Sequence, residues 1–162
     1  MNRDNIVLFA GNASQTLAGR VAQQLMQPLG FIQAEKFSDG ETRIEILENI
    51  RGRDIFLIQS TCPPANEHLM ELLFMADACR RASAKSISAV VPYFGYSRQD
   101  RRPRNTRGPI SAKLVGDLIE TSGISRLITI DLHADQIEGF FSIPVDNVYS
   151  SPVLLGDIWK QK

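Results

Sequence analysis

The chain has 162 residues and a mass of 18.1 kDa, which corresponds to one domain of ordinary size. Hydrophobic residues make up 43% and charged residues 22%, so the composition excludes a disordered, collagen-like or coiled-coil chain. Eighteen Lys and Arg balance eighteen Asp and Glu, which argues against a protein that coats nucleic acid through a broad basic surface.

The two cysteines, Cys62 and Cys79, are too few for a disulfide framework. We expect both to be reduced thiols in a cytoplasmic protein. The apolar run near the amino terminus stops at Ala10, which is too short for a signal peptide, and no stretch reaches the roughly 18 apolar residues of a membrane span. The sequence therefore predicts no association with a membrane.

Short apolar runs alternate with segments of helical periodicity along the chain. The continuous, β-rich runs predict buried strands at 6–10, 54–59, 86–91 and 126–130. Recurring apolar residues predict helices from the N-cap Ser14 through Leu25 with Gly30 as the stop signal, over 69–79, over 110–120 before Gly123, and over 152–159.

This alternation predicts an α/β fold, a three-layer parallel sheet with helices on both faces, in a single domain over residues 1–162. Residues 37–50 alternate polar and apolar, which predicts a half-exposed β hairpin, or flap, at an edge. Ligands of such sheets bind beyond the carboxyl ends of the strands, so the loops that follow the strands are the candidates for a site.

The loop after Val91 is rich in arginine. Five arginines fall within residues 98–107, and three aromatic residues precede them. Guanidinium groups bind phosphates in a bidentate manner and aromatic rings stack on bases, so the loop suits a nucleotide or a polyphosphate. A solvated basic loop is one alternative, and RNA is another, because arginine and aromatic side chains also contact RNA. The position after a central strand favours a small phosphorylated ligand.

The loop after Ile130 contains an Asp-x-His pair. In an extended segment Asp131 and His133 point to the same side, and Asp146 is a third residue that could complete a metal site. These ligand types leave Mn, Fe, Zn and Mg open, and a histidine that hydrogen-bonds a neighbouring carboxylate is the structural alternative. His68 lies on a predicted helix without such a pattern, so we interpret it as structural or exposed.

Two other turns carry weaker signals. Residues 37–41 combine two acidic groups with Gly40, which turn chemistry alone explains. Residues 11–14 only weakly resemble a phosphate-binding helix start, and the chain has neither a dinucleotide-binding glycine pattern nor a P-loop.

Five motifs closely resemble those of the ribose-phosphate pyrophosphokinase family, whose enzymes make phosphoribosyl pyrophosphate. The resemblance covers essentially the whole chain, and it implies a phosphoribosyltransferase-like fold and ribose-phosphate diphosphokinase activity. In that reaction the 1-hydroxyl of ribose 5-phosphate attacks the β-phosphorus of ATP, and AMP leaves. The motifs occur in the family's order: FSDGE at 37–41, NIRG at 49–52, PYFGYSRQDR at 92–101, PISAK at 109–113 and DLHADQIEGFFSIPVD at 131–146.

The resemblance also implies roles for individual residues. His133 matches a residue that contacts both metal and ATP phosphates, and it is the candidate catalytic residue. Asp131, His133 and Asp146 match the family's metal site, which favours Mg²⁺ among the metals left open above. The residues matched to ATP binding, of which those at 37–41 reach the adenine from a neighbouring subunit in the family, are Phe37, Asp39, Gly40, Glu41, Tyr96, Arg98, Gln99, Asp100 and Arg101.

The partners implied by the resemblance are ATP and ribose 5-phosphate as substrates and phosphate and ADP as effectors. Arg51 and the arginines near Arg104 match the regulatory anion site. A homo-oligomer is implied, in which dimers assemble into hexamers, with neither nucleic acid nor a membrane as partner.

The sequence departs from the family pattern in two ways. Ser142 stands where family members carry Asp, which removes one acidic group from the metal-site motif. Family chains are also about twice as long, and the motif that binds ribose 5-phosphate is not found before Lys162. We therefore expect the N-terminal, ATP-binding half of such an enzyme, inactive by itself, without the C-terminal ribose-5-phosphate half. A non-catalytic regulatory or associated nucleotide-binding subunit is the alternative.

Overall fold

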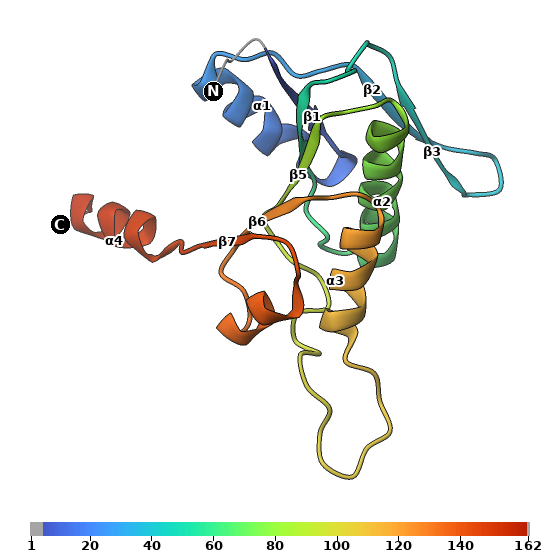
Figure 1. Ribbon diagram of the computed structural model, residues 1–162. Helices are drawn as coiled ribbons and strands as arrows, with labels where there is room; N and C mark the ends of the chain where they lie inside the picture. The colour runs from blue at the N-terminus through green and yellow to red at the C-terminus, as the bar shows by residue number, and fades with distance from the viewer. Residues whose placement is uncertain (1–4, 162) are drawn as a thin grey trace.

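The computed structural model describes residues 5–161 and shows an α/β architecture (Figure 1). Five parallel strands form one sheet in the order β1-β4-β5-β6-β7, which confirms the predicted parallel sheet and adds a fifth strand to the four that the sequence indicates. The strands are β1 (Ile6–Ala10), β4 (Asp54–Ile58), β5 (Ser86–Val91), β6 (Arg126–Ile130) and β7 (Val145–Val148), and the helices are α1 (Gln15–Leu25), α2 (Ala65–Arg81), α3 (Ser111–Thr121) and α4 (Ser151–Lys160), with 3₁₀ segments η2 (Asn12–Ser14) and η3 (Asp135–Phe140).

The main core lies between one face of this sheet and the helices α2 and α3. Parallel pairing sets Val7 beside Ile55 and Phe9 beside Leu57, so alternate side chains of neighbouring strands meet on that face. The predicted apolar face of α2 is buried against them. Its buried members are Leu69, Leu72, Leu73, Met75, Ala76 and Cys79.

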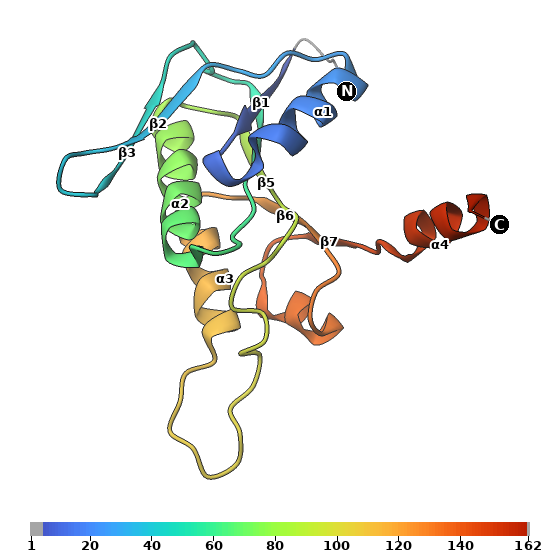
Figure 2. The ribbon, with the colours of Figure 1, turned by 180° about the vertical axis from the view of Figure 1, so that it is seen from behind.

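Helix α1 covers the opposite face only in part (Figure 2). Its Ala18 packs against Ala10 and Ile58, over β1 and β4. Beyond it, the face formed by β4 to β7 carries an open hollow of about 690 Å³, whose lining includes Phe56 and Ile128. Helices therefore lie on both faces, as predicted, and part of one face stays open.

A hairpin of β2 (Ile32–Lys36) and β3 (Thr42–Ile46) forms a separate antiparallel sheet. Its apolar residues Ile32, Ile44 and Ile46 pack against the main core, and β3 lies along α2. The predicted hairpin is present, but its first strand precedes the predicted range 37–50, and it does not extend an edge of the parallel sheet. It is held instead by α2.

Other elements also differ from the sequence predictions. Helix α1 ends at Leu25 because Met26 takes a left-handed conformation, with φ 53°, and its N–H bonds back to the last turn. Gly30 is therefore not the stop signal. Strand β7 and the 3₁₀ segment η3 were not predicted, because β7 has four residues, two of them polar, and gains its order from pairing with β6.

Helix α4 projects from the rest of the chain (Figure 1). None of its residues is buried, although much of its surface is apolar. The large apolar side chains that it exposes by half or more are Val153, Leu154, Leu155, Ile158 and Trp159.

Within residues 5–161, no helix combines the length and the apolar character needed to cross a membrane.

The exposed apolar side chains of α4 predict that the 162-residue chain self-associates in isolation. Removing apolar surface from water contributes about 25 cal/mol per Å², so pairing of these helices is favourable. We expect the sedimentation coefficient in analytical ultracentrifugation to rise with concentration. The double change Leu155→Ser with Trp159→Ser should weaken the association. A wild-type chain that stays monomeric at high concentration would contradict the prediction.

The Cys79 thiol should not react in the folded protein. It is fully buried in the core, and burial raises its pKa to about 12, because the thiolate would lose its hydration. At pH 8 it therefore stays protonated as well as inaccessible. We expect a Cys62→Ser variant to release no colour with a disulfide reagent until denaturant is added. Rapid reaction of that variant under native conditions would show that Cys79 is not packed as described.

Candidate functional site

A cleft of about 160 Å³ opens at the carboxyl ends of β5 and β6, which are neighbours in the sheet. The loop after β5 contributes Arg98, and the segment after β6 contributes Asp131 and His133. The basic loop and the Asp-x-His pair therefore meet, because parallel strands bring their carboxyl ends to one edge. The remaining lining residues are Tyr93, Phe94, Ser97, Ile130 and Leu132.

The start of the basic loop is anchored in the core. Phe94 is buried and packs edge-on against Phe141, with ring centroids 5.9 Å apart. The Gly95 N–H donates to Thr61 Oγ1 at 2.7 Å, and a Cβ at position 95 would lie 2.5 Å from the Thr61 carbonyl oxygen. Tyr96 follows with a φ of 64°. These contacts fix the point from which the arginine-rich segment leaves the sheet.

Asp131 is held at the end of β6 with a φ of 48°. Its Oδ1 accepts the Ser150 N–H at 3.1 Å. Hydrogen bonding from Ser150 lowers the pKa of Asp131 below its ordinary value, because it stabilises the carboxylate. The Leu132 N–H donates to Asn147 Oδ1 at 3.2 Å, which fixes the backbone that leads to His133. Asp131 is therefore an ionised acceptor at neutral pH, with the exposed His133 beside it in the cleft.

Asp146 lies apart from these two residues. It is paired with Ile128 inside β7, and it lines the open face of the sheet. Its Oδ2 accepts a hydrogen bond from Arg126 Nε at 2.7 Å. Within residues 5–161, no three His, Cys, Asp or Glu side chains are grouped so that they could hold one metal ion. The structure brings Asp131 and His133 together and does not bring Asp146 to them.

The segment 98–101 has one buried side chain among three exposed ones. Arg98, Gln99 and Arg101 are exposed. Asp100 is only 8% exposed, and its Oδ2 accepts a hydrogen bond from Gln136 Nε2 at 2.8 Å. Gln99 lies beside the first turn of α3, and its carbonyl oxygen accepts the Ala112 N–H at 3.1 Å. The arginines are therefore free to contact an anion, while Asp100 attaches the loop to η3.

The tip of the β2–β3 hairpin carries the other matched residues. The Phe37 N–H donates to the Glu41 carbonyl oxygen at 2.8 Å, and the Glu41 N–H donates to Asp39 Oδ1 at 3.0 Å. Gly40 has a φ of 92°, which glycine adopts without steric cost. Turn chemistry thus accounts for the shape of the tip. It leaves the Phe37 ring half exposed.

A larger groove of about 470 Å³ lies between the tip of the hairpin and α2. Its lining combines apolar, neutral polar and acidic side chains without an arginine or a lysine, so it does not suit phosphate. The Tyr96 hydroxyl donates to Asn66 Oδ1 and so ties the start of the basic loop to one end of this groove. The lining residues are Gly40, Glu41, Thr42, Asn66, Glu67, Met70 and Phe74.

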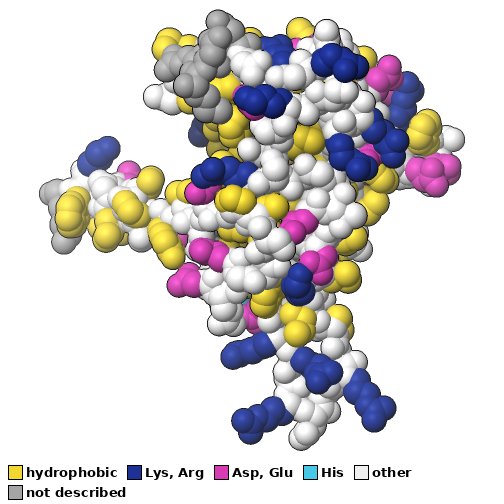
Figure 3. All heavy atoms as spheres, in the orientation of Figure 1, with side chains coloured by type: hydrophobic (Ala, Val, Ile, Leu, Met, Phe, Trp, Pro, Cys, Tyr) yellow, Lys and Arg dark blue, Asp and Glu magenta, His cyan; other side chains and the backbone are white. Residues whose placement is uncertain are grey.

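The hairpin tip and the basic loop lie in different parts of the molecule. In Figures 1 and 2 the hairpin stands beside α2, while the loop between β5 and α3 projects from the far end. The arginines of this loop form the lower basic cluster in Figure 3. Arg51 precedes β4 at the amino-end edge of the sheet, whereas Arg104 lies in the loop beyond the carboxyl ends. Within one chain, therefore, the hairpin tip does not lie at the cleft, and Arg51 does not lie near Arg104.

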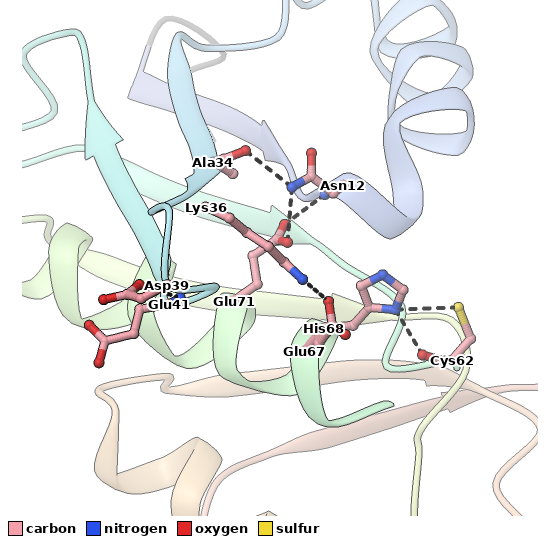
Figure 4. Close-up of polar contacts among 9 residues, drawn as sticks. All are labelled: Asn12, Ala34, Lys36, Asp39, Glu41, Cys62, Glu67, His68 and Glu71. Atoms are coloured by element: carbon pink, nitrogen blue, oxygen red, sulfur yellow. Dashed lines mark hydrogen bonds and ion pairs between the residues drawn. The ribbon is translucent and has the colours of Figure 1, made fainter. Parts of the chain in front are cut away.

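Side chains of the protein itself close the loop after β1. The buried carboxylate of Glu71 accepts the Asn12 N–H at 2.6 Å (Figure 4). The buried Gln59 accepts the Ala13 N–H on Oε1 at 3.1 Å. A carboxylate here takes the position that a phosphate takes at other helix starts. Residues 11–14 are therefore a structural turn.

His68 has a structural role, as the sequence suggested. Its Nδ1 donates to the Cys62 carbonyl oxygen at 2.8 Å, which connects α2 to the segment after β4 (Figure 4).

The chain is similar to known proteins in sequence and in fold. Residues 6–123 match the family described as the N-terminal domain of ribose phosphate pyrophosphokinase. The chain belongs to the ribose-phosphate pyrophosphokinase family. A ribose-phosphate pyrophosphokinase of Neisseria meningitidis serogroup A is 57% identical over 159 residues, and one of Burkholderia pseudomallei is 56% identical over 160 residues. A crystal structure of phosphoribosylpyrophosphate synthetase from Mycobacterium smegmatis matches with a TM-score of 0.93 at 44% identity.

These matches cover nearly all of this chain but only half of each relative. The covered shares are 98% of this chain and 49% of the Neisseria protein, and 99% and 50% for the Burkholderia protein. For the Mycobacterium structure they are 96% and 52%. The chain therefore spans about half the length of the ribose-phosphate pyrophosphokinases that it matches.

Ser142, the departure from the family motif, lies outside the cleft. Its N–H donates to Glu120 Oε1 at 2.7 Å, at the side of α3. This contact uses the backbone of residue 142, so it does not depend on whether the side chain is serine or aspartate.

Several residues that orient the site were not identified from the sequence. Asn147 and Ser150 hold the backbone and carboxylate around Asp131, and Asn66 binds Tyr96. Asn147 lies on β7, a strand too short and polar to be predicted, so no signal marked it. Asn66 is the second residue after the proline pair at 63–64, which is a signal for the start of a helix.

Replacing Gly11 by alanine should destabilise the fold. A Cβ there would lie 2.3 Å from Gln59 Oε1 and 2.9 Å from Glu71 Oε1, and both side chains are buried. Overpacking of this kind costs about 1–3 kcal/mol. Chemical denaturation monitored by circular dichroism measures the loss.

Gly19→Ala provides the matched control for this change. Position 19 lies on α1, and a Cβ there meets nothing within 4 Å. Helix propensity predicts a gain of about 0.5–1 kcal/mol. Equal stability of the two variants would mean that the Gly11 turn is not as closely packed as the structure shows.

Proposed function

We propose that the native-length protein is a ribose-phosphate diphosphokinase. It transfers the β,γ-diphosphoryl group of ATP to the 1-hydroxyl of ribose 5-phosphate and forms phosphoribosyl pyrophosphate and AMP. The observation that carries the proposal is the cleft in which Arg98 lies with Asp131 and His133, in a chain of this family. A guanidinium, an ionised carboxylate and an imidazole around one small cleft suit a polyphosphate and its metal ion.

In this proposal the cleft binds the phosphates of ATP. Arg98 contacts them through its planar donor fork, and Arg101 extends the positive charge along the loop. His133 donates a hydrogen bond to a phosphate oxygen from the opposite wall and is the catalytic residue that we assign. Gln99 and Asp100 act by holding the loop against α3 and η3.

Asp131 and His133 would hold Mg²⁺. The donor set fits the ion, because the carboxylate of Asp131 is ionised and its Oδ2 is not used in the hydrogen bond with Ser150. Mg²⁺ accepts one or two carboxylates and completes its shell with phosphate oxygens and waters. When bound, the ion supplies neutralisation of phosphate charge. Asp146 is engaged by Arg126 and is not part of the set that we propose.

The adenine contact comes from a second copy. The hairpin tip with Phe37, Asp39, Gly40 and Glu41 stands away from the cleft of its own chain, and an exposed aromatic ring suits a planar base. A homo-oligomer that sets the tip of one chain over the cleft of another would complete the ATP site.

The remaining partners follow from the proposed reaction. We assign the ribose 5-phosphate site to the part of the longer relatives that this chain does not cover. Phosphate and ADP are the effectors. Their anion site would combine Arg51 of one copy with Arg104 of another. We place the protein in the cytoplasm, where its two free thiols, Cys62 and Cys79, are compatible with a reducing environment.

The test begins with the intact mass of the protein in its source, followed by an assay of the native-length protein with ATP, Mg²⁺ and ribose 5-phosphate. We expect AMP to form in step with the consumption of ribose 5-phosphate. The 162-residue chain alone should bind nucleotide without turnover. Native-length protein that binds ATP but forms no AMP would favour a regulatory subunit and contradict the proposal.

Arg98→Ala should lower kcat/KM for ATP by roughly 10–100-fold, the effect of losing a charge-assisted hydrogen bond of about 1.5–3 kcal/mol. Arg98→Lys should lose less, because it keeps the charge without the planar fork. Arg20→Ala, on the exposed surface of α1, is the matched control and should leave the rate unchanged. Equal activity of the Arg98→Ala variant and the wild type would remove Arg98 from the site.

A further inference from the structure

Contacts of different kinds determine the orientation of the β2–β3 hairpin. Its apolar residues pack against the main core, and near the tip Lys36 forms an ion pair with Glu67 on α2. Apolar packing is not directional, and an exposed ion pair contributes little. A third contact, with the loop after β1, is directional.

Asn12 makes that third contact (Figure 4). Its Nδ2 donates to the Ala34 carbonyl oxygen in the middle of β2 at 3.2 Å, and it also donates to Glu71 Oε2 at 3.1 Å. Both partners are acceptors only, so the group facing them is the NH₂ and not the carbonyl of the carboxamide. One side chain thus bridges the hairpin and α2.

Glu71 determines how this side chain is placed. It is buried, and its Oε1 also accepts the Asn12 N–H at 2.6 Å. The carboxylate therefore binds the backbone and the side chain of Asn12 at once and limits the rotation of the carboxamide. The second N–H of the NH₂ group is left to point at Ala34. The hydrogen bonds that join Glu71, Asn12 and Ala34 form a strut from α2 to the hairpin.

We propose that Asn12 is a positioning residue that sets the orientation of the hairpin for recognition of the adenine base. The proposal rests on the function proposed above, in which the hairpin tip contacts the base. Asn12 is not among the residues that line the cleft. Its loss should therefore affect the choice of base more than the chemistry at the phosphates.

Two variants separate the effect of losing the strut from the effect of destabilising the turn at residue 12. In Asn12→Asp the new carboxylate faces Glu71, so the turn is destabilised and the donor to Ala34 is lost. In the double variant N12D/E71Q the new amide donates to the new carboxylate, which restores the contact with α2. Position 12 still has no donor for the Ala34 carbonyl. The double variant should recover stability without recovering the strut.

The first measurement is hydrogen exchange of the backbone amides of residues 32–46 in the native-length protein. In the double variant we expect exchange there to be about two- to tenfold faster, the range that follows from loss of one hydrogen bond. Amides of β4 and β5 should be unchanged. Wild-type exchange of the hairpin in the double variant, at restored stability, would overturn the proposal.

The second measurement compares kcat/KM for ATP and GTP. The ATP-to-GTP ratio should fall by a similar factor in the double variant, through KM, while kcat at saturating ATP stays near the wild-type value. A merely structural role would restore the ratio together with stability. Gln24→Ala, exposed on α1, is the control and should change neither readout.

The two measurements distinguish this inference from the proposed function. A wild-type protein that forms no AMP would refute the function, and hydrogen exchange would still decide whether Asn12 positions the hairpin. Faster exchange with an unchanged ATP-to-GTP ratio in an active enzyme would refute a role of the strut in base recognition.

Discussion

The adjacency of β5 and β6 in one parallel sheet is the constraint on which the site depends. Burial of Ala89, Val91 and Leu127 between the sheet and the helices holds these strands together, and parallel pairing makes both end at the same edge. Arg98 and His133, far apart in the sequence, therefore line one cleft. In the function that we propose, the phosphate site needs both the basic loop and the Asp-x-His pair, and this adjacency brings them together.

Helix α2 is the second organiser, because it serves both the core and the polar surface around the site. Its apolar face packs on the sheet. Its polar edge presents Glu71 to the loop after β1, Glu67 to the hairpin and Asn66 to Tyr96. The hairpin and the start of the basic loop are thus both held by α2, although the hairpin tip and the basic loop lie in different parts of the molecule.

In a single chain, several apolar surfaces stay exposed, and residues matched to one ATP site lie apart. The hairpin tip stands away from the cleft, α4 exposes its apolar side chains, and the face over β4 to β7 is open. The chain also spans only half the length of its relatives. In the enzyme that we propose, the tip of one copy serves the cleft of another, so assembly and catalysis are linked by the same hairpin.

The sequence by itself determined the fold class, the order of the strands along the chain and the loops that carry charge. Continuous apolar runs and helical periodicity report which residues are buried, and these signals are local. It also identified the family, through motifs such as the segment 98–101 and the Asp131–His133 pair. Only the tertiary structure decided which polar groups meet. Glu71 binds Asn12, which lies 59 residues away in the sequence. Arg126 binds Asp146 on the open face of the sheet, away from the cleft, and β7 forms only by pairing with β6. Such contacts depend on the packing of strands and helices that are distant in sequence, which periodicity does not encode.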